Sequence, residues 1–233
     1  MNNVPHIAFL HVGVETLFPT LLARSLRLHH PNARILQCSD RNTPEIKGVD
    51  EVFRFVGDVS NLMTFRLQCF SSLDTTNPTL FLDTDMLCVG SLDPTQIIQD
   101  ADVAVCAREF GCQDILNTSF CGMDLSEYSG KTLGDIYPYV ACATVTRSGK
   151  FWEDCLRNLR QLHPKFHFWY GDQEAIRNVA NSGAYKVKFL KESEYGCLPD
   201  QKMPIAHAPR LYHFKGARRK SMMIDYARNL GLM

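Results

Sequence analysis

Two carboxylates follow a short apolar run near the middle of the chain. The run Thr79–Leu82 is typical of a buried strand, and Asp83 and Asp85 come directly after it. Side chains two residues apart on an extended backbone point to the same side, so these carboxylates should converge. Such a pair suits a hard divalent cation of the Mg²⁺ or Mn²⁺ type that also holds phosphate oxygens. The same residues would equally suit a solvated turn at the end of a strand.

A histidine, a glycine and a basic cluster lie close together near the C-terminus. The segment Arg210–Phe214 is typical of a short strand and contains His213, which is followed by Gly216 and the cations of residues 218–220. An imidazole here can complete a metal site, the glycine lets backbone approach a phosphate, and the cations can neutralise a diphosphate. A hydrogen-bonded core histidine followed by a solvated helix start is the alternative interpretation.

Asp172 and Gln173 form a third polar group, at the start of a predicted helix over residues 172–181. Aspartate is a common N-cap, and that structural role alone would explain Asp172. A role for either residue in a binding site is equally compatible with its chemistry. The residues themselves leave both interpretations open.

The scaffold that must position these groups is indicated by alternating strand and helix patterns. Strands are predicted at His6–Val12, Arg34–Cys38, Val52–Val56, Thr79–Leu82, Asp102–Cys106, Tyr139–Thr146, Tyr185–Leu190 and Arg210–Phe214. Helices are predicted at Leu17–His29, Asn61–Leu73, Lys150–His163, Asp172–Asn181 and Arg218–Leu230. This alternation predicts an α/β fold with a mostly parallel central sheet flanked by helices. Such sheets bind ligands at the carboxyl ends of their strands. Because no repeat or linker divides the chain, we predict a single domain over residues 1–233.

Composition excludes several classes of function. The 25 Lys and Arg balance the 25 Asp and Glu, so the net charge of zero argues against a nucleic-acid partner. No apolar stretch approaches the roughly 18 residues of a membrane span, and the N-terminal residues lack the basic start of a signal peptide. The 9 cysteines contain no C-x-x-C pair, which argues against zinc and for free thiols in a reducing compartment. We therefore expect a cytoplasmic protein without an integral membrane segment.

The order of the three polar groups resembles the GT-A glycosyltransferases, most closely glycosyltransferase family eight, the group of glycogenin and the lipopolysaccharide galactosyltransferases. The resemblance rests on the D-x-D after an apolar strand, the Asp172-Gln173 pair opening a helix, and His213-Phe214-x-Gly216. It implies a GT-A domain with a Rossmann-like nucleotide-binding half over residues 1–90 and an acceptor-binding half over residues 91–233. It also implies a metal-dependent transfer of a hexose from a nucleotide sugar to a hydroxyl-bearing acceptor, with UDP as the usual carrier and with retention at the anomeric carbon.

The resemblance assigns roles to individual residues. Asp83, Asp85 and His213 would bind Mn²⁺ or Mg²⁺, and Asp172 and Gln173 would contact the donor sugar or the acceptor as candidate catalytic residues. The nucleotide sugar would be bound by His11, Val12, Gly13, Arg66, Asp83, Thr84, Lys215, Gly216 and Arg219. The irregular segment Arg108–Pro138, rich in Gly, Asn, Ser and Tyr, is the candidate acceptor loop. The acceptor itself is a saccharide, a lipid-linked saccharide or a protein.

The chain departs from the family pattern at two places. Ala141-Cys142-Ala143 stands where the family often has Asn-x-Gly, and Arg219 followed by Lys220 stands where it has a lysine. These differences bear on which sugar is bound.

Two other functions remain open. Haloacid dehalogenase-type phosphatases also present a D-x-D at a strand end, but their motif continues with Thr or Val where this chain has Leu87. A module that binds nucleotide sugars or carbohydrates without turnover is the third option, because a fold alone does not guarantee catalysis. The sequence does not indicate an oligomeric state.

Overall fold

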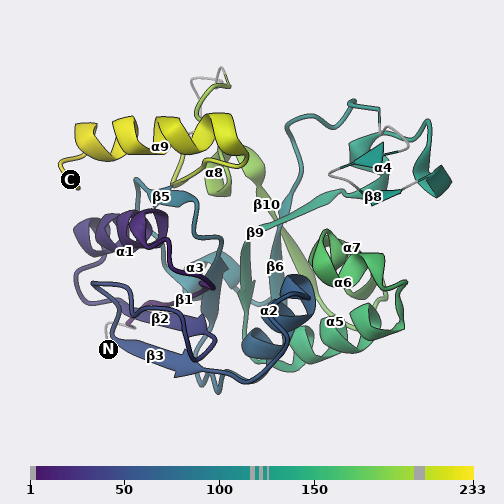
Figure 1. Ribbon diagram of the computed structural model, residues 1–233, viewed down its shortest axis with the longest axis horizontal. Helices are drawn as coiled ribbons and strands as arrows, with labels where there is room; N and C mark the ends of the chain where they lie inside the picture. The colour runs from purple at the N-terminus through teal and green to yellow at the C-terminus, as the bar shows by residue number, and fades with distance from the viewer. Residues whose placement is uncertain (1–3, 116–118, 121–122, 125, 202–207) are drawn as a thin grey trace.

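A seven-stranded sheet forms the middle layer of the protein in the computed structural model, which describes residues 4–115, 119–120, 123–124, 126–201 and 208–233 (Figure 1). Its strands lie in the order β10-β6-β9-β4-β1-β2-β3. Their bounds are β1 His6–Leu10, β2 Arg34–Ser39, β3 Glu51–Arg54, β4 Thr79–Leu82, β6 Val103–Ala107, β9 Tyr139–Thr146 and β10 Val187–Lys191.

The sheet is mixed, with one reversed strand. β9 pairs antiparallel with its two neighbours, β4 and β6. The other pairings are parallel: they join β4, β1, β2 and β3 on one side of β9, and β6 with β10 on the other side. Six strands therefore run in one direction, and their carboxyl ends lie at the same edge of the sheet. The predicted mostly parallel α/β sheet is confirmed, and the D-x-D lies at the edge where ligands bind in such folds.

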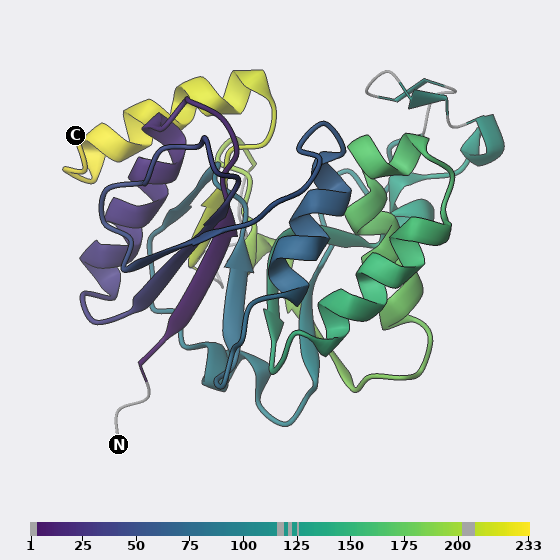
Figure 2. The ribbon, with the colours of Figure 1, turned by 60° about the horizontal axis from the view of Figure 1, so that its bottom comes forward.

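Helices cover both faces of the sheet (Figure 2). One face packs against α2 (Leu62–Ser71), α5 (Lys150–Gln161), α6 (Lys165–Phe168) and α7 (Gly171–Ala180). The other face packs against α1 (Leu17–His29), α3 (Pro94–Ile98) and α8 (Glu192–Tyr195). Alternation along the strands builds both cores, since Ile7 and Phe9 face the α1 side and Ala8 faces the α2 side.

The core beneath α2 and α5 is centred on three aromatic rings. Phe70, Phe81 and Trp152 have ring centroids 4.7 to 5.2 Å apart and tilted or edge-on planes, which is the favoured geometry for aromatic pairs. Because α2 is anchored by Phe70 in this cluster, the rest of the helix has a fixed position over the strand that ends in the D-x-D.

The C-terminal segment returns to the middle of the fold through a second, two-stranded sheet. β5 (Met86–Cys88) pairs antiparallel with β11 (Leu211–His213), and the register places His213 opposite Met86. The following helix α9 (Ala217–Asn229) packs against α1 around Phe214 and Met223. This pairing brings the C-terminal histidine next to the D-x-D.

In its described residues, the connection between β6 and β9 contains short elements: β7 (Ser119–Phe120), β8 (Met123–Asp124), a 3₁₀ turn (Ser126–Tyr128) and α4 (Leu133–Ile136). It corresponds to the predicted acceptor loop, of which residues 116–118, 121–122 and 125 lie outside the described part of the chain. The strands and helices predicted from the sequence are present with ends that differ by a few residues. Helices in the described part of the chain are all too short or too polar to cross a bilayer.

Candidate active site

Asp83, Asp85 and His213 converge at the carboxyl end of β4. Each residue offers one ligand atom, and these three atoms all lie within 4.8 Å of one another. Nε2 of His213 lies 3.8 Å from Oδ2 of Asp83 and 3.5 Å from Oδ1 of Asp85. The convergence expected from the two separate sequence motifs is therefore found.

The two carboxylates have the same arrangement of contacts: one oxygen lies near His213 and the other near a basic side chain. Asp83 directs Oδ2 toward His213 and accepts from Arg66 at Oδ1, 2.8 Å away. Asp85 directs Oδ1 toward His213, and its Oδ2 lies 3.8 Å from Nζ of Lys220. Each acid thus presents one oxygen to the imidazole and the other to a cation, so two carboxylate oxygens and one ring nitrogen face a common point.

This donor set fits a divalent metal ion. Ligand atoms lie about 2.0 to 2.2 Å from Mn²⁺-sized or Mg²⁺-sized ions, so two ligands of one ion are at most about 4.4 Å apart. The distances of 3.5 and 3.8 Å from His213 to the carboxylates fall within that limit. Two oxygen donors with one imidazole favour a hard or borderline ion over a thiophilic one.

The electrostatics of the group depend on its burial. Burial raises the pKa of Asp83, as does the neighbouring Asp85 carboxylate, while Arg66 opposes the shift. Burial also acts to raise the pKa of Asp85, but the hydrogen bond and charge of His213, together with the charge of Lys220, lower it overall. The two carboxylates therefore differ in proton affinity, as expected for acids that share one site. A bound cation would favour the ionised form of both.

Arg66 on α2 joins the D-x-D to the start of α7. Its guanidinium contacts Asp83 and also Asp172, with Nη1 2.9 Å from Oδ2 of Asp172, and it donates to the carbonyl of Ala141 on β9 at 2.9 Å. Arg66 and Asp172 are both buried. The predicted binding residue Arg66 and the predicted catalytic residue Asp172 thus belong to the same cluster as the candidate metal ligands.

Asp172 lies in the first turn of α7, and its side chain does not cap the helix. The N-cap is Tyr170, and the helix begins at Gly171. The Asp172 carboxylate instead accepts from Arg66 and, through Oδ1, from the amide of Gln173 at 2.8 Å. The N-cap interpretation of Asp172 is therefore wrong, because its carboxylate is directed to Arg66.

Gln173 is held by a residue that sequence reasoning missed. Arg108, directly after β6, donates through Nη2 to Oε1 of Gln173 at 3.1 Å and through Nε to the carbonyl of Tyr137 at 2.6 Å. The amide oxygen of Gln173 is therefore engaged by a cation. Arg108 follows an apolar strand as the other site residues do, and that placement is the signal that could have identified it.

The segment His11-Val12-Gly13 lies beyond the end of β1, beside β4. Register pairs Phe9 with Leu82, so His11 and Asp83 leave neighbouring strands at the same edge. His11 is buried, and burial lowers its pKa. Gly13 has a φ of 114° and donates its amide to Oγ1 of Thr43 at 2.8 Å. This left-handed conformation favours glycine. The hydrogen bond to Thr43 keeps the segment close to the turn after β2.

The basic residues after His213 have unequal surroundings. Lys215 lies 3.3 Å from the fully buried carboxylate of Glu192, and Arg219 donates through Nε to Asp200 at 2.8 Å. Lys220 is directed toward Asp85, as described above, and lies over the ring of Phe18. Gly216 has a φ of 83° and nothing within 4 Å of the position of a Cβ, so its backbone is open to a ligand. Lys215, Gly216 and Arg219 are the phosphate contacts that the resemblance implies, and Lys220, a member of the predicted basic cluster, is the cation directed toward the candidate metal ligands.

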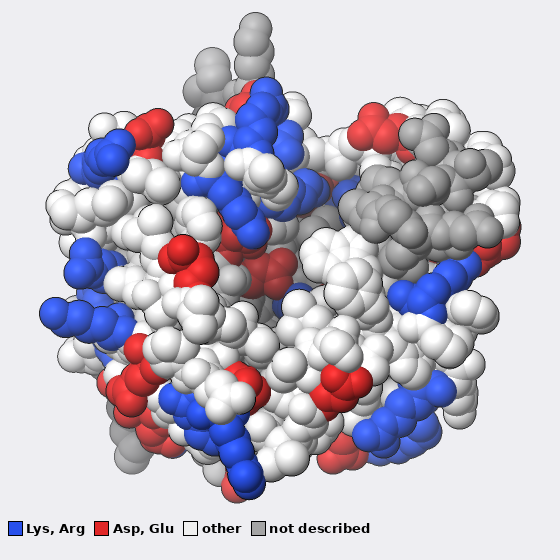
Figure 3. Space-filling view, in the orientation of Figure 1, with Lys and Arg blue, Asp and Glu red and all other residues white. Residues whose placement is uncertain are grey.

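The face that carries the carboxyl ends of the strands is hollowed near its centre (Figure 3). Acidic side chains form part of the floor of this hollow, and basic side chains lie along its rim near the start of α9. Thr84 lies between the two aspartates, partly exposed. A cation on the acidic floor and an anion at the basic rim would each meet side chains of opposite charge.

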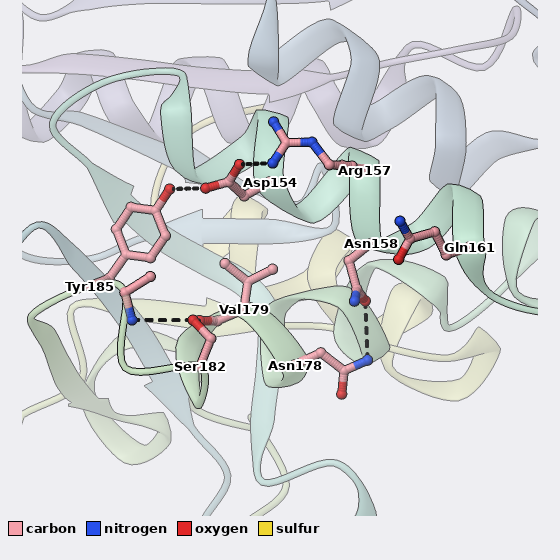
Figure 4. Close-up of a pocket in the computed structure, with 9 residues that line it drawn as sticks. Asp154, Arg157, Asn158, Gln161, Asn178, Val179, Ser182 and Tyr185 are labelled. Atoms are coloured by element: carbon pink, nitrogen blue, oxygen red, sulfur yellow. Dashed lines mark hydrogen bonds and ion pairs between the residues drawn. The ribbon is translucent and has the colours of Figure 1, made fainter.

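A different cavity, of about 250 Å³, lies between α5, α7 and the segment before β10 (Figure 4). Its polar groups bind one another: Tyr185 donates to Asp154 at 2.6 Å, and Asn178 donates to Asn158 at 3.0 Å. The segment before β10 lies at the amino edge of the sheet, opposite the D-x-D. This cavity therefore does not share the candidate active site.

The fold is that of the GT-A glycosyltransferases. The structure is similar to the galactosyltransferase LgtC, solved with donor and acceptor sugar analogues, with a TM-score of 0.59 and 15% sequence identity over 96% of this chain and 95% of that one. It is also similar to the glycosyltransferase GlyE of Streptococcus pneumoniae TIGR4, with a TM-score of 0.57 and 15% identity over 97% of this chain and 60% of that one. The bifunctional glycosyltransferase WbbM has a TM-score of 0.55 and 16% identity over 98% of this chain and 50% of WbbM.

These structures confirm the predicted fold class and the predicted resemblance to the glycosyltransferases of the LgtC group. No protein-family model matches the sequence. None of the curated proteins matches it either. Sequence identities of 14 to 16% make the fold the shared property, so activity has to be argued from the site.

Proposed function

We propose that this chain is a metal-dependent glycosyltransferase that moves a hexose from a UDP-sugar to a hydroxyl-bearing acceptor with retention. One observation carries the proposal: Asp83, Asp85 and His213 direct three donor atoms to a common point at the carboxyl edge of a GT-A sheet. That edge is where open α/β sheets bind nucleotides. Residues 1–90 would form the nucleotide-binding half, and residues 91–233 the acceptor-binding half.

The proposed metal ligands are Asp83, Asp85 and His213, and Mn²⁺ or Mg²⁺ is the proposed ion. When bound, the ion would act as a Lewis acid for the diphosphate of the donor. The basic residues beside it would stabilise the charge that grows on the leaving diphosphate. Lys215, Arg219 and Lys220 are the candidates for this role, and the open backbone of Gly216 would allow the phosphates to approach.

Arg66 and Asp172 would orient the donor sugar. Their buried ion pair fixes both side chains beside Asp83, so their positions do not depend on the ligand. His11, Val12 and Gly13 would contact the base and ribose at the end of the neighbouring strand, and Thr84 would line the site between the metal ligands.

Gln173 is the proposed residue at the reacting face of the sugar. One of the similar structures is an LgtC variant in which an active-site glutamine was changed to glutamate. A glutamine in the active site of a similar fold supports a role for Gln173 here. Arg108 binds the amide oxygen of Gln173, which leaves its NH₂ group to donate to the substrate. We infer that Gln173 positions the donor sugar or the acceptor, since its oxygen already accepts from a cation.

The acceptor side of the site lacks one polar group of the family pattern. Ala141 and Ala143 carry no side-chain amide, although the carbonyls of Ala141 and Cys142 bind Arg66 and the amide of Asp83. LgtC was solved with donor and acceptor sugar analogues, which supports a sugar as acceptor here too. The cytoplasmic location stays a prediction.

Product analysis tests the proposed function against its alternatives. We expect Mn²⁺-dependent release of UDP from a UDP-hexose, measured in a coupled assay with a panel of glycoside acceptors. Release of inorganic phosphate from a monoester without UDP release would indicate the phosphatase. Saturable binding of UDP-sugars without any release of UDP, in the presence of the whole acceptor panel, would indicate a binding module.

A thermal-shift experiment with Asp85→Ala tests the metal site, with Asp225→Ala as the matched control. A ligand that binds only the native state raises the melting temperature, so Mn²⁺ with a UDP-sugar should stabilise the wild-type protein. Asp85→Ala should abolish the Mn²⁺-dependent part of the shift. Asp225→Ala, a substitution in an exposed pair on α9, should leave it unchanged. An undiminished Mn²⁺ effect in Asp85→Ala would contradict the site assignment.

A further inference from the structure

Two neighbouring aromatic side chains at the end of α6 are exposed. Phe168 is 59% exposed and Trp169 is 39% exposed, whereas the other tryptophan, Trp152, is 1% exposed. Their ring centroids are 6.3 Å apart. Neighbouring large apolar groups that stay in contact with water are typical of a binding surface.

The backbone beside these rings is held in an unusual conformation. Tyr170 has a φ of 60°, in the left-handed region that residues other than glycine seldom occupy. The next residue, Gly171, packs so closely that a Cβ would lie 2.0 Å from the carbonyl oxygen of Phe166. Such strained turns persist where the surroundings impose them, often at functional sites. This restrained backbone directly follows Trp169 and limits how the residue can move relative to α7.

A partly buried ring and a buried ring lie behind Trp169. Trp169 meets the partly buried Tyr170 edge-on, with centroids 6.1 Å apart, and Tyr170 lies 5.2 Å from the fully buried ring of Tyr137. These contacts restrain the indole of Trp169, which lowers the entropy lost when a ligand is bound.

This surface adjoins the candidate active site. Asp172 follows Trp169 by three residues, which limits the separation of their Cα atoms to about 11 Å. Asp172 is bonded to Arg66, and Arg66 to Asp83. Figure 1 shows α6 and α7 next to each other, with the segment that carries α4 and β8 beside them. A molecule resting on Trp169 would thus extend from the metal ligands toward the predicted acceptor loop.

We propose that Trp169 and Phe168 form the stacking surface for the sugar ring of the acceptor. This inference rests on the proposed transferase function and adds a substrate class to it, a pyranoside acceptor. One face of a pyranose carries only C–H groups, which have a partial positive charge and pack on the negative face of an aromatic ring. Nearby polar groups, such as the amide of Gln173, would bind the hydroxyls at the ring edge. Two rings are too small a surface for a stable protein partner, which needs about 1,000 Å².

Tryptophan fluorescence tests the proposal without turnover. The chain has 2 tryptophans, so the difference between wild type and Trp169→Phe reports the exposed indole alone. The probes are methyl α- and β-glucosides and galactosides, lactose and maltose, each added with and without Mn²⁺ and UDP, with glycerol as the control for bulk solvent. We expect at least one glycoside to shift the Trp169 emission to shorter wavelength and to protect it from acrylamide, saturably. Absence of a saturable response to every glycoside would overturn the proposal.

The kinetic experiment separates this inference from the proposed function. Trp169→Ala and Phe168→Ala should each raise the acceptor KM roughly three- to tenfold, as expected from the energies of aromatic pairs. The KM for the UDP-sugar and its slow hydrolysis without acceptor should not change. Phe189→Ala, which removes an exposed ring on β10, is the matched control and should leave all constants unchanged.

The possible results have distinct meanings. An active transferase whose acceptor KM is the same in Trp169→Ala, Phe168→Ala and wild type would overturn the stacking surface. A protein that binds a glycoside at Trp169 but releases no UDP from any UDP-sugar would contradict the transferase function, and the stacking surface would stand.

Discussion

Lys220 places its ammonium group 3.8 Å from a carboxylate oxygen of Asp85. The neighbouring Arg219 is directed instead to Asp200 and to the carbonyl of Lys215. A shift of one position along α9 thus determines which cation faces the candidate metal site. Because the helix turns by about 100° per residue, consecutive side chains cannot serve the same site equally.

Lys220→Ala should therefore weaken binding of UDP in the presence of Mn²⁺ by about tenfold, the usual effect of losing one charged contact. Arg219→Ala removes the same charge from the same helix and should weaken binding by less than about threefold. Isothermal titration with UDP measures both. A larger loss for Arg219→Ala than for Lys220→Ala would contradict the assignment.

The buried ion pair of Arg66 leads to a prediction about stability. Arg66→Met keeps much of the side-chain volume but leaves the buried carboxylate of Asp172 without its partner. Breaking a buried pair in this way costs about 3 to 5 kcal/mol, which urea unfolding can measure. Arg157→Met is the control, because the Arg157 side chain is mostly exposed and Asp154 keeps Lys150 as a second partner, so the pair should contribute less than about 1 kcal/mol. Equal effects of the two substitutions would show that the Arg66 pair is not desolvated.

Metal binding should depend on pH through His213. Burial alone would lower the pKa of this histidine, but the neighbouring Cys142 and Asp85 raise it to about 10. In the metal-free protein His213 is then charged at neutral pH, and it has to lose its proton to bind an ion. Mn²⁺ binding should release a proton and tighten as pH rises from 6 toward 9. Calorimetry in buffers with different ionisation enthalpies measures that proton.

The same shift predicts how stability of the metal-free protein varies with pH. A histidine whose pKa is raised in the folded state contributes stability that is complete below about pH 6.5, its unfolded value, and is lost as pH rises toward 10. His213→Gln should remove this part of the pH dependence between pH 7 and 10. An identical pH profile for wild type and His213→Gln would contradict the raised pKa.

Gly171 leads to a prediction about packing. Gly171→Ala places a methyl group 2.0 Å from the Phe166 carbonyl oxygen and 2.4 Å from the side chain of Leu159, so α7 has to move. We expect a loss of about 3 kcal/mol in the free energy of unfolding, at the upper end for overpacking, and reduced activity because α7 carries Asp172. Gly183→Ala, at a left-handed glycine with open space around it after the end of α7, should cost only about 1 kcal/mol and keep activity. Unfolding curves and UDP-release rates compare the two variants.

Local patterns were sufficient to predict the sheet and the D-x-D. Strand β4 is a run of four apolar or β-branched residues buried on both faces, and the acids that follow it mark its end. The short elements β5, α3, α6 and α8 were not predicted, because three to five residues are too few for a periodic pattern.

The partners of the site residues could not be predicted in the same way. Arg66 and Asp172 are 106 residues apart, and no local pattern connects them. The same applies to Arg108 and Gln173, 65 residues apart. Asp172 was open to an N-cap interpretation because its type and position suit a cap, and only the structure shows that Arg66 binds its carboxylate. Pairing over long distances depends on topology, which a single sequence does not encode locally.

The antiparallel pairing of β5 with β11 also separates the imidazole from the strands of the central sheet. The last strand of that sheet along the chain ends at Lys191, whereas His213 is supplied by β11. Only three residue pairs join β11 to β5, yet they determine how near the imidazole comes to the two acids. The seven-stranded sheet is hydrogen-bonded without this small sheet, so the scaffold and the third candidate ligand are held by separate sets of backbone hydrogen bonds.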